Sequence, residues 1–269
     1  MTMIHTSSTL RLLGNDRLSR ATAALAAVFW GVFFFGLIDL LAFAQGEEFH
    51  ASMVLSTGWG LLFLVLVAAP LFVRAMAASL SACVPSQIAV VGAALAVGAV
   101  LSTSPRHLLL AAAVGVTAVA VTIGSPYRNL FGTWRPSLLS LLVVAVAVLP
   151  CLAYAWTSAR RTGTPIVSDD TWSLDHWPVQ ASLALAVLLL AAFSAGRPTG
   201  WQIPAYTVTA STAWFAVVCL FQPHLTGSVG RGWAIAMLMW AATFLLALHY
   251  PSSVEVARRR PASQLAPVG

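Results

Sequence analysis

The sequence contains no lysine, and only 8% of its 269 residues carry a charge. Soluble globular domains carry charges on about a quarter of their residues, so this scarcity excludes an ordinary soluble fold. Hydrophobic residues make up 59% of the chain, and the mean hydropathy is +0.86. We therefore expect the chain to lie in a lipid bilayer. Its richness in Ala, Val, Leu and Arg is typical of high-GC coding and favours a bacterial source.

Cysteine is also scarce. Cys83, Cys151 and Cys219 lie in or beside apolar runs without CxxC or Cys/His ligand spacing, which predicts inert packing residues. All fourteen basic residues are arginines, scattered instead of forming a stripe, so no nucleic-acid surface is expected. HExxH, GxSxG, CxxCH and phosphate-loop patterns are absent from the sequence, and no pattern identifies a reaction or a cofactor.

Eight apolar segments are long enough to cross a bilayer, since a helical crossing needs about 20 residues. The sequence therefore predicts an all-α, polytopic integral membrane helical bundle with eight transmembrane helices, forming a single domain over residues 21–250. The expected helices cover residues 21–44, 53–75, 86–103, 107–124, 137–158, 178–196, 204–222 and 230–250.

The arginines predict which side each loop faces, because short cytoplasmic loops carry an excess of Arg. With a cytoplasmic N-terminus, ten of the fourteen arginines fall on the inner side and only Arg106, Arg160, Arg161 and Arg231 on the outer side. Both termini are then cytoplasmic, in an N-terminal tail over residues 1–20 and a C-terminal tail over 251–269 that is expected to be disordered. The predicted location is the plasma (inner) membrane.

Carboxylates and imidazoles gather toward the predicted outer face. Outer loops need polar residues and disfavour arginine, so this enrichment has a purely topological explanation. Alternatively, side chains from several loops converge on one pocket, as helical bundles build metal, proton or ligand sites. The candidate ligand-binding residues are Asp39, Glu47, Glu48, His50, Asp169, Asp170, Asp175 and His176, and the candidate metal ligands are His50, Asp169, His176 and His224.

The stretch VSDDTWSLDHWPVQ, residues 167–180, carries three of the eight acids. Ser168 followed by two aspartates is typical of a helix start. The sequence therefore predicts a short surface helix in which Asp169, Ser173 and His176 share a face. The structural alternative makes Asp175 a dipole-complementing acid at the entry to the next span, with Pro178 in its first turn.

Asp39 stands apart because it lies inside an expected span. An ionisable residue costs about 2.5–3.5 kcal/mol at the centre of a membrane helix and is a functional candidate for that reason. Its place near the outer end allows two explanations. It either reaches interfacial water or an outer arginine, or it is buried and carries protons.

Three functional classes follow from these patterns. The leading expectation is an extracytoplasmic site, rich in Asp, Glu and His, for a small ligand, metal or proton. The second is a non-catalytic module that assembles with another membrane protein or with copies of itself. The third is a transporter of a neutral or lipophilic solute, with the hydroxyls of Thr207, Thr209, Ser211 and Thr212 lining its path.

Overall fold

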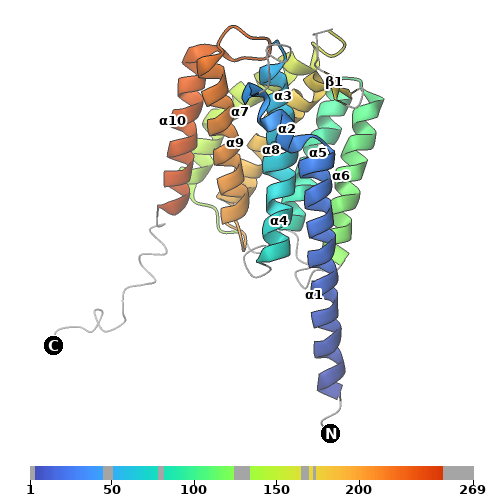
Figure 1. Ribbon diagram of the computed structural model, residues 1–269. Coiled ribbons are helices and arrows are strands. Elements are labelled where there is room, and N and C mark those ends of the chain that lie inside the picture. Colours follow the sequence, from blue (N-terminus) through green and yellow to red (C-terminus); the bar gives the residue numbers. More distant parts are fainter. Residues whose placement is uncertain are drawn as a thin grey trace, which may run out of the picture.

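The computed structural model describes residues 4–44, 51–77, 82–123, 134–164, 170–171 and 174–250 of the chain. Within these ranges the protein is an all-α bundle, interrupted by one short antiparallel strand pair, β1 (Asp170–Thr171) and β2 (Leu174–Asp175). Seven helices are long and apolar enough to cross a membrane, as their parallel arrangement in Figure 1 illustrates. The chain is a membrane protein.

These seven helices lie within two residues of the ranges expected from the sequence. The first is continuous but contains a π-helical middle, so it consists of α3 (Met53–Gly60), η4 (Leu61–Ala68) and α4 (Ala69–Met76). The other six are α5 (Val84–Leu101), α6 (Pro105–Ile123), α7 (Leu138–Ala159), α8 (His176–Ala195), α9 (Gln202–Phe221) and α10 (Gly230–His249).

The remaining helix, expected over residues 21–44, is interrupted in the structure. Its elements are α1 (Ile4–Val28), the π-helix η1 (Phe29–Phe33), α2 (Gly36–Leu40) and the 3₁₀-helix η2 (Ala42–Ala44). The break falls at Phe35, whose φ of 62° is left-handed. It accompanies packing of the Phe34 ring against Trp59 and Phe63, at centroid distances of 5.3 and 4.9 Å. Aromatic packing therefore accompanies the interruption.

This interrupted segment runs along the whole length of the helix formed by residues 53–76. Contacts join α1 to α4, η1 to η4, and α2 to α3, which is an antiparallel order. A Cβ placed on Gly60 would collide with the backbone nitrogen of Leu40, so glycine permits the close approach of α2. The two segments thus span the same thickness of the bundle.

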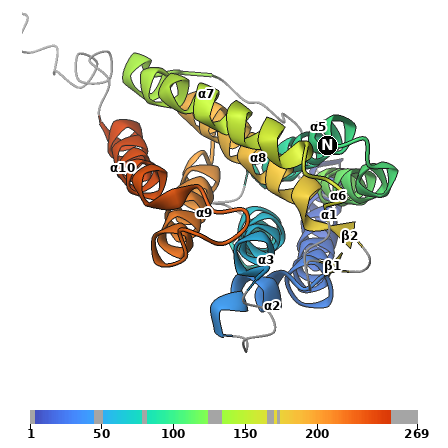
Figure 2. The same cartoon turned by 90° about the horizontal axis from the view of Figure 1, so that it is seen from above.

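Helix α8 lies at the centre of the bundle, against α3, α5, α7 and α9, as the view from above shows (Figure 2). Its buried Gln180 donates to the carbonyls of Val54 and Leu55 at 3.0 and 3.1 Å and accepts a hydrogen bond from Tyr154 at 3.3 Å. Gly58 leaves the space that this side chain occupies. Small residues therefore allow a polar group to join three helices in the core.

A second buried amide compensates for a proline. Pro70 lacks the N–H that a regular α-helix would direct to the Leu66 carbonyl. Gln87 of α5 donates to that carbonyl instead, at 3.1 Å. A neighbouring helix therefore satisfies the carbonyl that this proline leaves without a partner.

The two ends of the bundle differ in their polar contacts. At one end, called here the Arg74 end, Arg74 donates to Asp16 at 2.7 Å and Arg20 donates to the Ala75 carbonyl at 2.8 Å. Arg197 donates to the Leu248 carbonyl at 2.6 Å. Arginines therefore bond helix C-terminal carbonyls, where a positive charge complements the helix dipole. Helix α1 begins and α10 ends at this end (Figure 1).

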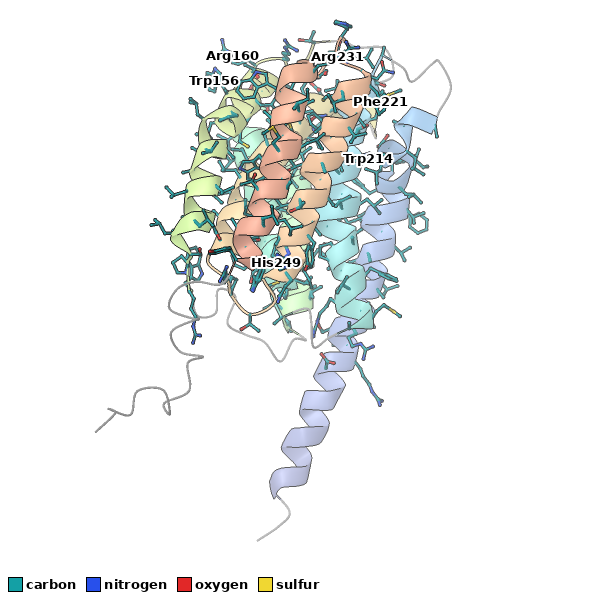
Figure 3. All side chains as sticks on the ribbon, turned by 90° about the vertical axis from the view of Figure 1, so that its left-hand side faces the viewer. Trp156, Arg160, Trp214, Phe221, Arg231 and His249 are labelled. Carbon is teal, nitrogen blue, oxygen red and sulfur yellow. The ribbon has the colours of Figure 1, made fainter. Side chains whose placement is uncertain are left out.

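The opposite end, called here the His107 end, holds the turns α5–α6 and α9–α10 and the connection from α7 to α8. Arg160 and Arg231 lie at this end, across the bundle from His249 (Figure 3). These turns position the candidate site.

Candidate functional site

The turn between α5 and α6 begins with a regular helix ending. The Ser104 amide donates to the Ala99 carbonyl at 2.9 Å, and the Thr103 amide donates to the Val100 carbonyl at 3.1 Å. This pair of bonds is a Schellman motif, which requires a left-handed residue and usually uses glycine. Thr103 takes that position with a φ of 50°. A β-branched residue is strained there, and its side chain is exposed beside the candidate site.

His107, in the first turn of α6, connects this turn to the start of α8. Its Nε2 lies 2.9 Å from the Asp175 carbonyl oxygen, and its Nδ1 lies 2.7 Å from the Ser104 hydroxyl. Because a carbonyl only accepts, Nε2 carries the proton, and Nδ1 of the neutral ring accepts from Ser104. The imidazole is buried. It therefore holds two loops together and offers no free nitrogen to a ligand.

Asp175 uses both carboxylate oxygens to organise the connection from α7 to α8. Oδ1 accepts from the Trp177 amide at 2.8 Å, and Oδ2 accepts from the Gly163 amide at 2.6 Å. Asp175 is thus the N-cap of α8, and Pro178 lies in the first turn of that helix. The structural interpretation of Asp175 and Pro178 is confirmed.

A polar pocket of about 640 Å³ lies between the α5–α6 turn, the end of α7 and Asp175. We call it the Ser102 pocket. Its wall includes the guanidinium-bearing residues Arg106 and Arg160 and the hydroxyl-bearing residues Ser102, Thr103, Ser104 and Thr162. Ser102 is only 4% exposed, and its Oγ has no hydrogen-bond partner among the described residues. Buried hydroxyls are almost always hydrogen-bonded to protein or to ordered water, so this atom needs a partner from outside the described chain.

The charges around the pocket favour an anion. Arg106 and Arg160 are the basic residues of its wall, and Asp175 is the acidic one. The Asp175 carboxylate already accepts two backbone hydrogen bonds, and the Arg160 guanidinium lies over the Trp156 ring, 5.7 Å from its centroid. The pocket also borders the first turn of α6, where the helix dipole is positive.

The structure brings few of the predicted site residues into this pocket. Asp175 lines it, whereas His176 is 1% exposed and packs its ring against Trp59 at a centroid distance of 4.9 Å. Asp39 is buried in α2 and lines neither this pocket nor the second cavity described below. His224 is exposed in the turn between α9 and α10. Outside the described residues lie Glu47, Glu48, His50 and Asp169, together with the side chain of Asp170.

The surface helix expected near Ser168 is wrong where the structure describes this segment. Asp170–Thr171 and Leu174–Asp175 form paired strands, and the helix begins only at His176. The capping acid is Asp175, seven residues later than Ser168, because its carboxylate reaches the Trp177 amide. Of the three residues proposed to share a face, Asp169 and Ser173 lie outside the described residues, and His176 begins α8.

A metal centre finds no support in the described ranges, where no three His, Cys, Asp or Glu residues come together in a metal-binding arrangement. The cysteines are free thiols. Cys83 donates to the Gly200 carbonyl at 2.8 Å, and burial raises the pKa of this thiol to about 12. It stays protonated at neutral pH and is therefore unreactive.

Sequence reasoning placed Arg106 and Arg160 only as topology signals and did not select Ser102 or His107 for the site. One local signal was present, because Ser104, Pro105 and His107 match an N-cap, N1 and N3 pattern. The pocket itself had no local signal, since His107 and Asp175 are 68 residues apart in the chain.

No protein-family model matches the sequence, and neither a curated protein nor a solved structure matches it.

Proposed function

We propose that the chain is a bacterial plasma-membrane protein that crosses the bilayer eight times, with both termini in the cytoplasm, and that its outer face binds a small phosphate-type anion in the Ser102 pocket. The Ser102 hydroxyl carries this proposal, because it is buried in the wall of a pocket beside two arginines and has no partner within the described chain.

The eighth crossing is supported by the packing of the interrupted first segment. It extends antiparallel along all three parts of the helix of residues 53–76. A break in a membrane helix is tolerated where neighbouring protein covers it, and here Trp59 donates to the freed Phe34 carbonyl at 3.0 Å. An even number of crossings also agrees with the start of α1 and the end of α10 at one end of the bundle (Figure 1).

The orientation is supported by the arginines. Ten of the fourteen are assigned to the Arg74 end and the tails, and four to the His107 end. The positive-inside rule then assigns the Arg74 end to the cytoplasm. The Ser102 pocket would face the outside at the level of the lipid headgroups.

A phosphate group suits the pocket for three reasons. Two guanidinium groups supply planar pairs of donors that match phosphate oxygens. Ser102 and its neighbouring hydroxyls add neutral donors. Finally, a cation would meet two positive charges and a carboxylate that is already hydrogen-bonded, so a metal or a proton is the weaker ligand.

The binding test uses the full chain in nanodiscs of neutral phosphatidylcholine, titrated with inorganic phosphate by calorimetry. A second arm replaces part of the lipid with phosphatidylglycerol and measures thermal stability, which separates a lipid headgroup from free phosphate. Arg160→Gln and Ser102→Ala should each weaken phosphate binding about tenfold, because a hydrogen bond to a charged group contributes about 1.5–3 kcal/mol. Arg231→Gln removes the same charge at the same end, outside the pocket, and should leave affinity unchanged.

If Arg160→Gln and Arg231→Gln weakened phosphate binding equally, the effect would be one of general charge, and phosphate binding in the Ser102 pocket would be refuted. If neither inorganic phosphate nor phosphatidylglycerol bound, the proposed anion site would also be refuted, and a non-catalytic assembly module would be favoured as the function. The topology is tested separately by an impermeant thiol reagent on intact cells. Thr164→Cys should react and Arg135→Cys should not, and the reverse pattern would overturn the orientation.

A further inference from the structure

Two hydroxyls in the middle of α9 differ from the other helical hydroxyls around them. Thr209 donates to the Ala205 carbonyl at 2.8 Å, as serines and threonines in membrane helices commonly do. Ser211 and Thr212 lie within one turn of it, are 1% and 4% exposed, and have no hydrogen-bond partner within the described residues. Unsatisfied hydroxyls in an apolar setting cost stability.

Both residues line a second cavity, of about 430 Å³, between α7, α8, α9 and α10. Its size falls in the range of about 300–1,000 Å³ that small-molecule sites occupy. The other walls are mostly alanine, aliphatic and aromatic side chains, and none of the described residues that line it is charged. A charged ligand is excluded from such surroundings.

The cavity lies in the half of the bundle nearer the His107 end. Thr157, two residues before the end of α7, and Trp233, in the first turn of α10, both line it. Val146 and Trp233 also belong to the exposed surface, at 72% and 60% exposure. The mouth therefore lies on the side of α7 and α10 that would face lipid, the side turned to the viewer in Figure 3.

We infer that this cavity binds a neutral, lipid-soluble molecule whose carbonyl oxygen accepts hydrogen bonds from Ser211 and Thr212. Each observation contributes one property of the ligand. The uncharged walls require a neutral molecule, and the open side between α7 and α10 admits it from the bilayer. The two donors without partners require an acceptor. This site is separate from the Ser102 pocket and does not depend on the proposed function.

A water molecule is the competing occupant of the hydroxyl positions. A buried water needs two to four polar partners, and Ser211 and Thr212 supply only the minimum of two, because Thr157 already donates to the Ala153 carbonyl. A carbonyl oxygen needs only the two free donors. Its hydrocarbon part would also cover the apolar wall, which water would not.

The test is photolabelling of the full chain in nanodiscs with a fatty-acid methyl ester that carries a diazirine in its chain, followed by peptide mass spectrometry. Labels should concentrate on cavity-facing residues of α7 and α10. Methyl palmitate should compete for labelling, and hexadecane, which lacks the carbonyl, should compete about tenfold less well. That factor corresponds to two neutral hydrogen bonds.

Two variants sharpen the experiment. Ser211→Ala with Thr212→Val removes both hydroxyls at little cost in volume, and it should lower the affinity for methyl palmitate about tenfold. Ala184→Phe should abolish the labelling by filling the cavity. Thr243→Val is the matched control, because Thr243 is an exposed residue of α10 that donates to the Met239 carbonyl and does not line the cavity.

Equal competition by hexadecane, or an unchanged affinity in the hydroxyl double variant, would overturn the carbonyl ligand. Labels spread evenly over the lipid-facing helices would overturn the site itself, because they would report only surrounding lipid. Thermal unfolding of each variant shows whether it is folded. If Ala184→Phe is not folded, the affinity of the Ser211→Ala, Thr212→Val double variant for methyl palmitate alone tests the site.

Discussion

The Arg74 end and the His107 end differ in how their buried polar residues are bonded. At the Arg74 end, the guanidinium of Arg74 is fully buried and bonded to Asp16 and Ser19, and Ser19 in turn donates to the Val121 carbonyl at 3.0 Å. At the His107 end, the Ser102 hydroxyl is buried without a partner in the described chain. Both ends use polar groups to join segments, the His107 end through His107 and Asp175, and the two ends differ in the buried Ser102 hydroxyl.

The helix ends add a further comparison. Near the Arg74 end, arginines satisfy the last carbonyls of α4 and α10, which stabilises these helix ends. Each end also holds a non-glycine residue in a left-handed conformation, Thr103 at the His107 end and Arg197 at the Arg74 end. The difference between the two ends therefore rests on the Ser102 hydroxyl and not on backbone strain.

Breaking the Arg74 network should give the largest effect. Arg74→Met leaves the Asp16 carboxylate and the Ser19 hydroxyl without their donor, and losing one partner of a buried ion pair costs about 3–5 kcal/mol. Because Asp16 is 27% exposed, we expect a loss of about 3 kcal/mol. Unfolding in mixed micelles with increasing dodecyl sulfate measures it. Arg17→Met, at an exposed position of α1 next to Asp16, should change stability by less than about 0.5 kcal/mol. If Arg74→Met and Arg17→Met lowered the free energy of unfolding equally, the stabilising role of the Arg74–Asp16–Ser19 network would be refuted.

Asp175 separates the structural and the binding roles at the His107 end. Asp175→Ala removes an N-cap, so the free energy of unfolding should fall by about 1–2 kcal/mol. Phosphate should still bind, and more tightly, because a negative charge has left the wall of the Ser102 pocket. Asp175→Asn keeps an oxygen for the Trp177 amide and should lose less stability. A variant that keeps its stability but no longer binds phosphate would instead make this carboxylate a ligand.

The sequence predicted seven helix positions because membrane crossing depends on hydropathy summed over about 20 consecutive residues. It did not predict the break at Phe35, since that break accompanies packing of Phe34 against Trp59 and Phe63 of a different segment. The helix cap at Asp175 could be predicted from the sequence, because the amide that it accepts from is only two residues away. The helix start predicted at Ser168 was wrong, because the described residues that follow it do not form a helix before His176.

The site was less predictable than the fold for a physical reason. Clustering of acids on one face is a property of topology and does not imply that they meet. Asp39 and His176 were both assigned to this face, yet neither lines the Ser102 pocket. The pocket is formed instead by serines and arginines of the α5–α6 turn and the end of α7, which meet only after the helices pack.

The smallest effect concerns the strained turn, and its sign is opposite at two positions of the His107 end. A non-glycine residue in the left-handed region costs about 1–2 kcal/mol, so Thr103→Gly should raise the free energy of unfolding by about 1 kcal/mol. Gly163 provides the matched opposite, with a φ of 78° and open space where a Cβ would lie, so Gly163→Ala should lower it by about the same amount. Calorimetry on Thr103→Gly should also show weaker phosphate binding, because a hydroxyl leaves the pocket wall. A gain in stability with unchanged phosphate affinity would show that the strain at Thr103 serves no binding role.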